Sequence, residues 1–200
     1  NLILFNAAKY AEAIVGFSLA QSPLLGDFLD DLDPEMPLDW NNRDFSGLPE
    51  LKSHVILQAG LDGICTPADV LITAGAAEAN YLAVMQLLQP EDEIVIETPG
   101  WPQAEVLAKA IGAKVVKVTR DEADNWRLPL DRLADAITAK TKLIFLTNPN
   151  NPTGDMLDAS ELAQIVQMAD RVGAWLLVDE VYAGLEWDGP RAPSIAGMYA

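Results

Sequence analysis

The chain contains 200 residues, of which 50% are hydrophobic and 22% charged, a composition that is typical of a globular protein and excludes disordered and fibrous classes. Thirteen Lys and Arg against thirty Asp and Glu give a net charge of −17, which opposes binding to nucleic acid and to anionic membrane surfaces. No apolar run reaches the roughly 20 residues of a membrane span, and a single cysteine with a single histidine offers neither an internal disulfide nor a zinc cluster, so we expect a soluble, cytoplasmic protein without a metal site.

Residues 1–47 differ from the rest of the chain because they show little sustained periodicity. Five aspartates and three prolines lie close together here: Asp27, Asp30, Asp31, Asp33, Asp39, Pro23, Pro34 and Pro37. Composition alone leaves two interpretations open, an extended arm or a solvated acidic loop region.

The first predicted helix begins at Pro49, which suits the first turn of a helix. Leu51 and Val55 continue the apolar spacing of that helix for several residues.

A short buried strand is predicted at residues 70–72, followed by a turn at 73–77 and a helix at 78–88 with Leu82, Met85 and Leu88 on its apolar face. A glycine turn that leads from a strand into a helix can hold a phosphate, because free backbone N–H groups and the positive end of the helix dipole meet there. Most such turns merely reverse the chain, so the turn alone is weak evidence for a site.

The next predicted strand, residues 93–97, runs into a loop at 98–102 that two prolines make rigid. Trp101 is the one large aromatic residue on this loop. An aromatic residue beside two prolines often covers a hydrophobic edge, and that interpretation stays open at this point.

Strands and helices continue to alternate along the rest of the chain. We predict a helix at 104–111 closed by Gly112, a strand at 114–118 near a sheet edge, a helix at 130–137, and a helix between an Asp158/Glu161 capping box and Gly173. This alternation predicts an α/β fold with a mainly parallel sheet.

Two apolar runs, residues 143–146 and 175–178, indicate neighbouring strands that are buried on both faces. Polar residues follow each run directly, at 147–154 and at 179–182. Ligands of parallel sheets lie beyond the carboxyl ends of the strands, so these two segments are the best candidates for a site.

The segment Asn148-Pro149-Asn150-Asn151-Pro152-Thr153-Gly154, followed 28 positions after Asn151 by Asp179 and then by Tyr182, resembles the fold-type I, pyridoxal phosphate (PLP)-dependent aminotransferases of class I and II. The resemblance implies a three-layer α/β/α large domain with a mainly parallel sheet, incomplete in this chain. Residues 1–47 would form the N-terminal arm and part of a small domain, and residues 48–200 the PLP-binding large domain.

The resemblance also implies a role for each candidate site residue. Asp179 would keep the ring nitrogen of PLP protonated, and Asn151 and Tyr182 would donate hydrogen bonds to the 3′ oxygen of the ring. Trp101 would stack on the ring, and the turn formed by Gly75, Ala76 and Ala77 would bind the phosphate. Asn148 and Asn150 are predicted to be turn residues, because Asn side chains bond their own backbone in turns, and Pro152 and Gly154 would shape the loop that presents Asn151.

Two features depart from the family pattern. Many relatives carry a hydroxyl residue where this chain has Ala77, which removes one side-chain hydrogen bond. Family members commonly place a tyrosine before the glycine of the 44–52 segment to reach the phosphate of the partner subunit, whereas this chain has Trp40, Asn41, Asn42 and Phe45 there.

The lysine that forms a Schiff base with PLP in this family is expected beyond Ala200, because every lysine of the chain precedes Asp179. We therefore expect this sequence to be the N-terminal half of an aminotransferase that moves an amino group between an amino acid and a 2-oxo acid, as a homodimer. The alternatives are another fold-type I PLP enzyme, such as a lyase, decarboxylase or cyclase, and a non-catalytic PLP-sensing domain. The sequence does not identify the amino acid substrate.

Overall fold

The computed structural model describes residues 22–30, 32–35, 44–186 and 189–198. The chain divides into two compact units, residues 1–40 and 41–200. In the described part of the first unit, α2 spans Gly26–Leu29 and buries no residue. Trp40, Asn41 and Asn42, along with most of the predicted arm, lie outside the described residues. The assignment of residues 1–47 to an arm and to part of a small domain stays a prediction.

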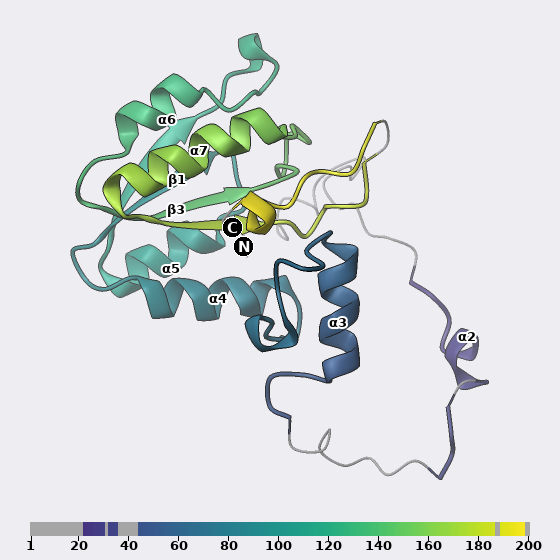
Figure 1. Cartoon of the computed structure of the whole chain (residues 1–200). Helices are drawn as coiled ribbons and strands as arrows, with labels where there is room; N and C mark the ends of the chain where they lie inside the picture. The colour runs from purple at the N-terminus through teal and green to yellow at the C-terminus, as the bar shows by residue number, and fades with distance from the viewer. Residues whose placement is uncertain (1–21, 31, 36–43, 187–188, 199–200) are drawn as a thin grey trace, which may run out of the picture. The chain divides into compact units, whose positions relative to one another are not determined.

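A four-stranded parallel sheet in the order β2-β1-β3-β4 forms the centre of the second unit (Figure 1). Its strands are β1 (Glu93–Thr98), β2 (Lys114–Thr119), β3 (Thr141–Thr147) and β4 (Trp175–Asp179). Thr147 pairs with Asp179 at the carboxyl ends of β3 and β4. The four strands predicted from 93 onward are confirmed, and β2 lies at a sheet edge as predicted. The predicted burial of residues 175–178 on both faces is wrong, because β4 is the other outer strand of the described sheet and its residues before Asp179 are exposed or only partly buried.

Helices cover both faces of this sheet, with α4 and α5 on one face and α6 and α7 on the other (Figure 1). The helices of the second unit are α3 (Pro49–Gln58), η2 (Pro67–Asp69), α4 (Ala76–Leu87), α5 (Gln103–Ile111), η3 (Glu122–Asp124), α6 (Leu130–Ala136), α7 (Ala159–Val172) and η4 (Ile195–Met198). Among the described residues, no helix is both long and apolar enough to cross a membrane.

Alternate side chains of the central strands enter two separate cores. Val95 and Ile144 pack in the core that contains α6 and α7, whereas Ile94 and Leu143 pack in the core that contains α4 and α5. All four side chains are fully buried. Successive residues of a strand point to opposite faces, so apolar residues at consecutive positions are what a sheet covered on both sides requires. The predicted three-layer α/β/α architecture is thereby confirmed.

The predicted strand at residues 70–72 is wrong. Leu71 is 56% exposed, and the Ile72 backbone N–H donates to the Ser46 carbonyl at 2.8 Å instead of joining the sheet. The segment lies between η2 and α4 in the chain and forms this hydrogen bond with the turn at residues 44–47. A run of three apolar residues is too short for its composition to distinguish a strand from a connection.

The predicted helices at Pro49 and after Gly75 are confirmed, but their buried faces differ from the predicted ones. In α4, Leu82 and Met85 are exposed, and the side turned to the core carries Asn80, Val84 and Leu88 at intervals of four. A buried asparagine interrupts the apolar pattern on the core side, so the apolar spacing in the sequence indicated the neighbouring face of the helix.

The buried face of α3 also differs from the predicted one, and it includes a lysine. Lys52 is buried and Leu51 and Val55 are exposed. The Lys52 ammonium group is compensated because it donates to Ser46 Oγ and forms an ion pair with Asp44 at 3.9 Å.

The capping box that starts α7 gives a stability prediction. The Asp158 carboxylate accepts a hydrogen bond from the Glu161 backbone N–H at 2.8 Å, and the Glu161 carboxylate accepts one from the Asp158 N–H at 2.9 Å. The substitution Asp158→Ala should lower the free energy of unfolding by about 1 kcal/mol, as urea denaturation would measure. The control Asp170→Ala, in the last turns of the same helix, should not destabilise; equal losses in both variants would contradict the prediction.

Candidate cofactor site

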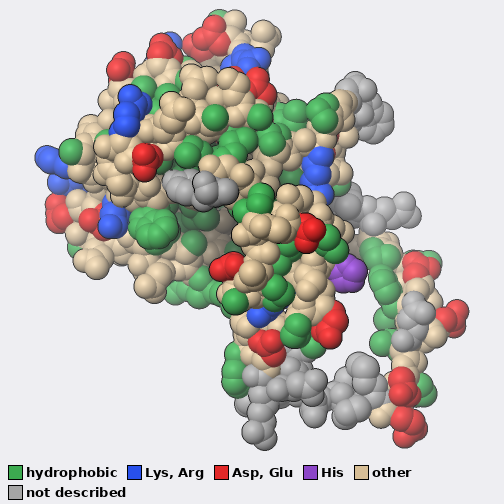
Figure 2. Space-filling view, viewed as in Figure 1, with side chains coloured by type: hydrophobic (Ala, Val, Ile, Leu, Met, Phe, Trp, Pro, Cys, Tyr) green, Lys and Arg blue, Asp and Glu red, His purple; other side chains and the backbone are tan. Residues whose placement is uncertain are grey.

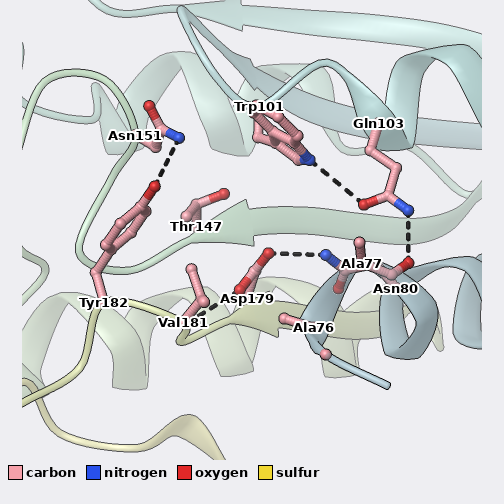
Figure 3. A pocket seen from close by; sticks show the side chains of 11 residues that line it. Ala76, Ala77, Asn80, Trp101, Gln103, Thr147, Asn151, Asp179, Val181 and Tyr182 are labelled. Carbon is pink, nitrogen blue, oxygen red and sulfur yellow. Dashed lines mark hydrogen bonds between the residues drawn. The ribbon is translucent and has the colours of Figure 1, made fainter. Parts of the chain in front are cut away.

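A pocket of about 290 Å³ opens at the carboxyl ends of β3 and β4 (Figure 3). Its lining comes from the start of α4 and the turn before it, the loop after β1, the start of α5, and the ends of β3 and β4 with the segments that follow them. The lining residues are Gly75, Ala76, Ala77, Asn80, Trp101, Gln103, Thr147, Asn151, Asp179, Val181 and Tyr182. Figure 3 shows Asn151 and Tyr182 at one end of the pocket and Ala77 and Gln103 at the other. The pocket therefore lies where the parallel topology predicted a site.

The turn before α4 presents backbone N–H groups at the start of a helix. Gly75 adopts φ +90°, a conformation that favours glycine, and α4 begins at the next residue. The N–H groups of Ala76 and Ala77 have no preceding helical turn to supply acceptors, so they are available to a ligand at the positive end of the helix dipole. The neighbouring N–H of Ala74 already donates to the Glu78 carboxylate at 2.5 Å. None of the residues that line the pocket is Lys or Arg, so the partial positive charge at this end of the pocket comes from backbone N–H groups.

Asp179 is the one charged residue among those that line the pocket. It ends β4, is 8% exposed, and is held through both carboxylate oxygens. Asn80 Nδ2 donates to Oδ2 at 2.7 Å, and the Val181 backbone N–H donates to Oδ1 at 3.0 Å. Each oxygen keeps a free lone pair, so the carboxylate can still accept a proton or a hydrogen bond from a ligand.

Asn151 and Tyr182 come from different segments and meet at the pocket. The Asn151 side-chain amide donates to the Tyr182 hydroxyl oxygen at 3.0 Å. Because the phenol accepts this bond, its own O–H remains able to donate to a ligand, as does the second N–H of the amide.

The segment after Tyr182 is fixed by Glu186. Its carboxylate accepts hydrogen bonds from the backbone N–H groups of Ala192 and Gly184, both at 2.8 Å. These bonds, that of Ala192 above all, hold the pKa of the Glu186 carboxyl below its ordinary value. The chain on the C-terminal side of Tyr182 is thus tied back on itself.

Trp101 lies on the loop between Pro99 and Pro102 and is 40% exposed. Its indole N–H points to Gln103 Oε1 at 3.4 Å, and Gln103 Nε2 donates to the Ala77 carbonyl at 2.6 Å (Figure 3). Gln103 therefore connects the aromatic loop to the first turn of α4.

The seven residues predicted for the site all line this one pocket. What each of them does toward a ligand stays a prediction. Sequence reasoning missed Asn80, Gln103, Thr147 and Val181. Asn80 could have been found, because it follows Ala76 by four positions and so lies on the same side of α4. The other three offered no comparable signal.

Two asparagines of the loop after β3 serve as turn residues, as predicted. Asn148 Oδ1 accepts from the Leu157 backbone N–H at 2.9 Å, and Asn150 Oδ1 accepts from the Thr153 backbone N–H at 3.1 Å. Neither asparagine lines the pocket. Their side chains shape the loop that presents Asn151.

Comparison with known proteins identifies the family. Residues 43–199 match the model of the family described as aminotransferase class I and II. The chain belongs to this family.

Several aminotransferases of this kind are similar to the chain. The aspartate aminotransferase of Musicola paradisiaca is 34% identical over 138 residues, which are 68% of this chain and 34% of that protein. The glutamate-pyruvate aminotransferase of Haemophilus influenzae is 30% identical over 174 residues, 86% of this chain and 43% of that protein. The chain thus spans less than half the length of these aminotransferases.

Solved structures of aminotransferases also resemble it. A PLP-dependent aminotransferase from Streptococcus suis superposes with a TM-score of 0.73 at 33% identity, covering 80% of this chain and 42% of that one. An alanine aminotransferase from Pyrococcus furiosus gives a TM-score of 0.72 at 33% identity, covering 78% and 40%. The chain therefore shares its fold with the corresponding part of these aminotransferases.

Proposed function

We propose that the protein binds PLP in the pocket at the ends of β3 and β4 and transfers an amino group between an amino acid and a 2-oxo acid. The observation that carries this proposal is the convergence of a buried carboxylate, a glycine turn at a helix N-terminus, an aromatic side chain and an Asn–Tyr pair in one pocket. Membership of the aminotransferase family supports it. A cytoplasmic location stays a prediction.

The chemical groups that line the pocket match the chemical groups of PLP. The Ala76 and Ala77 N–H groups suit a phosphate, the flat Trp101 indole suits an aromatic ring, and the Asp179 carboxylate suits a protonated ring nitrogen. Asn151 and Tyr182 supply donors for a ring oxygen. When bound, PLP would supply an electron-accepting pyridinium ring.

The residues of this chain would therefore bind and orient the cofactor. Asp179 would hold a proton at the ring nitrogen, and Asn80 would keep the Asp179 carboxylate turned into the pocket through their 2.7 Å hydrogen bond. None of the lysines in the described part of the chain lines the pocket. We therefore propose that the lysine nucleophile and base lies beyond Ala200.

The proposal is tested by labelling the complete protein. We expect borohydride reduction of the PLP-loaded protein, followed by peptide mapping, to place the pyridoxyl group on a lysine that follows Tyr182. A label on any of the seven lysines before Asp179 would contradict the assignment: Lys9, Lys52, Lys109, Lys114, Lys117, Lys140 and Lys142. Amino transfer from an amino acid to a 2-oxo acid by the same preparation separates transamination from other PLP chemistry.

We also expect the complete protein to be a homodimer. Hydrophobic side chains are exposed over α3, around the single histidine (Figure 2), including Leu51 and Leu57, which are 44% and 58% exposed. A symmetric partner would bury such side chains. Sedimentation at micromolar concentration should give the mass of a dimer, whereas a stable monomer loaded with PLP would refute this expectation.

A further inference from the structure

A buried ionic cluster lies behind the loop that carries Asn151. Arg120, the residue after β2, donates from Nε and Nη2 to Glu97 Oε2 at 3.0 and 2.6 Å, and from Nη1 to Asp155 Oδ2 at 2.5 Å. The side chains of Arg120, Glu97 and Asp155 are 0%, 3% and 15% exposed. None of the three lines the pocket.

The cluster joins the carboxyl ends of three strands. Glu97 is in β1, and its second oxygen, Oε1, accepts a hydrogen bond from the Thr147 backbone N–H at the end of β3, at 2.8 Å. The Arg120 backbone N–H donates to the Thr98 carbonyl of β1 at 2.7 Å. Arg120 and Glu97 are therefore fixed to the sheet independently of the loop.

Asp155 connects this fixed pair to the loop after β3. Its backbone carbonyl accepts from the Asn150 N–H at 2.8 Å, and the Asn150 carbonyl accepts from the Gly154 N–H at 2.9 Å. Asn151 lies inside the turn that these two bonds close. The Asp155 carboxylate is thus the point at which the turn carrying Asn151 is held to the buried guanidinium.

Stability alone does not account for this arrangement. Desolvating the charges offsets most of the attraction within a buried ion pair, so an apolar cluster of similar volume would stabilise the fold as well. Two carboxylates share one guanidinium here. A planar guanidinium does provide hydrogen bonds in fixed directions, which an apolar cluster lacks.

We propose that Arg120 and Asp155 are positioning residues that hold the loop at 148–155 so that Asn151, and with it Tyr182, faces the bound cofactor. The effect on the cofactor rests on the proposed function. The effect on the loop does not rest on the proposed function, and the two effects are measured separately.

The decisive variant is Asp155→Ala, which releases the loop while leaving the Arg120–Glu97 pair intact. Removing Arg120 instead would leave Glu97 buried and unpaired, and such a variant is expected to unfold. Asp155→Asn is the conservative variant, because its amide oxygen can still accept from Arg120. Arg127→Gln is the matched control, since it removes an ion pair with Glu161 in which the Arg127 side chain is 59% exposed.

The first measurement is amide hydrogen exchange in the complete protein without cofactor. In Asp155→Ala, the N–H groups of Thr153 and Gly154 should exchange about tenfold faster than in the wild type, because the turn opens more often. Asp155→Asn and Arg127→Gln should exchange as the wild type does. Unchanged exchange in Asp155→Ala would overturn the positioning role.

The second measurement is calorimetric binding of two ligands to the complete protein: pyridoxine 5′-phosphate, which has no aldehyde to react with a lysine, and its 3-deoxy analogue. We expect the wild type to prefer the first about tenfold, the equivalent of one good hydrogen bond. This preference should fall to about twofold in Asp155→Ala and persist in Asp155→Asn and Arg127→Gln.

The outcomes separate the two proposals. Loss of the preference with faster exchange supports the inference. A retained preference, or equal weakening of both ligands, overturns it, because the loop would then act on the fold in general and not on the ring oxygen. If the wild type itself shows no preference, the contact of Asn151 and Tyr182 with the ring oxygen is wrong, and hydrogen exchange alone decides whether Arg120 and Asp155 position the loop.

Discussion

Replacing Asp179 with Ala is expected to leave PLP bound to the complete protein and to reduce turnover about a hundredfold to a thousandfold. Neither the turn at Gly75, Ala76 and Ala77 nor Trp101 forms a hydrogen bond with the Asp179 side chain, which reaches α4 only through Asn80, so most contacts to the cofactor should survive. The charge partner of the ring nitrogen would be lost. Removing one preorganised electrostatic contact in a buried site commonly reduces turnover by about 10²- to 10³-fold.

The surroundings of Asp179 indicate that the negative charge of its side chain matters more than its volume. Asn80 and the Val181 backbone N–H hold the carboxylate in one orientation. Asp179→Asn keeps the shape and one acceptor oxygen but removes the charge, so it should be nearly as inactive as Asp179→Ala. A fully active Asp179→Asn protein would contradict the role at the ring nitrogen.

Single-turnover rates together with the absorbance of bound PLP would separate chemistry from binding. The control is Glu180→Gln, which removes the adjacent charge while retaining the oxygen that accepts from the Ile195 backbone N–H at 2.8 Å. This control should keep wild-type turnover. If Asp179→Ala lost the cofactor as completely as it lost turnover, Asp179 would be a binding residue and its assignment would be wrong.

The parts of the fold that were predictable from sequence are those encoded locally. β1 and β3 are continuous apolar runs, and α7 has both its cap residues and its terminating glycine in sequence. Apolar periodicity did not indicate the buried face of α4, because Asn80 is buried there by a hydrogen bond to Asp179, which is 99 positions away. Apolar periodicity carries no information about a polar side chain whose partner is that distant.

The candidate site also has parts that are encoded locally and parts that depend on distant residues. A local sequence pattern marks each of four segments: the turn at Gly75 to Ala77, the loop that carries Trp101, and the segments after β3 and β4. The topology of the sheet brings these segments to one pocket. No local sequence pattern indicated a role for Arg120. It bonds Glu97 across 23 positions and Asp155 across 35, and a lone arginine after an edge strand reads as a solvated residue until the tertiary contacts are known.

The substitution Trp101→Ala should have the opposite effect to Asp179→Ala. It should raise the dissociation constant of PLP about tenfold to a hundredfold, because stacking on an aromatic side chain contributes roughly 1–3 kcal/mol. The chemical step should slow by less than about threefold. An indole that stacks on the ring does so equally in the ground state and the transition state, so its loss weakens binding without raising the barrier of the chemical step.

Two further tryptophan variants decide between stacking and the polar contact of Trp101. Trp101→Phe keeps a flat ring but removes the N–H that points to Gln103 at 3.4 Å, a distance at which a hydrogen bond contributes little. It should therefore retain most of the affinity for PLP. Trp175→Ala, at the opposite end of β4 from Asp179, removes an indole that is 56% exposed and should bind PLP as the wild type does. If Trp101→Phe lost as much affinity as Trp101→Ala, the connection through Gln103 to the phosphate turn, and not stacking, would be what Trp101 contributes.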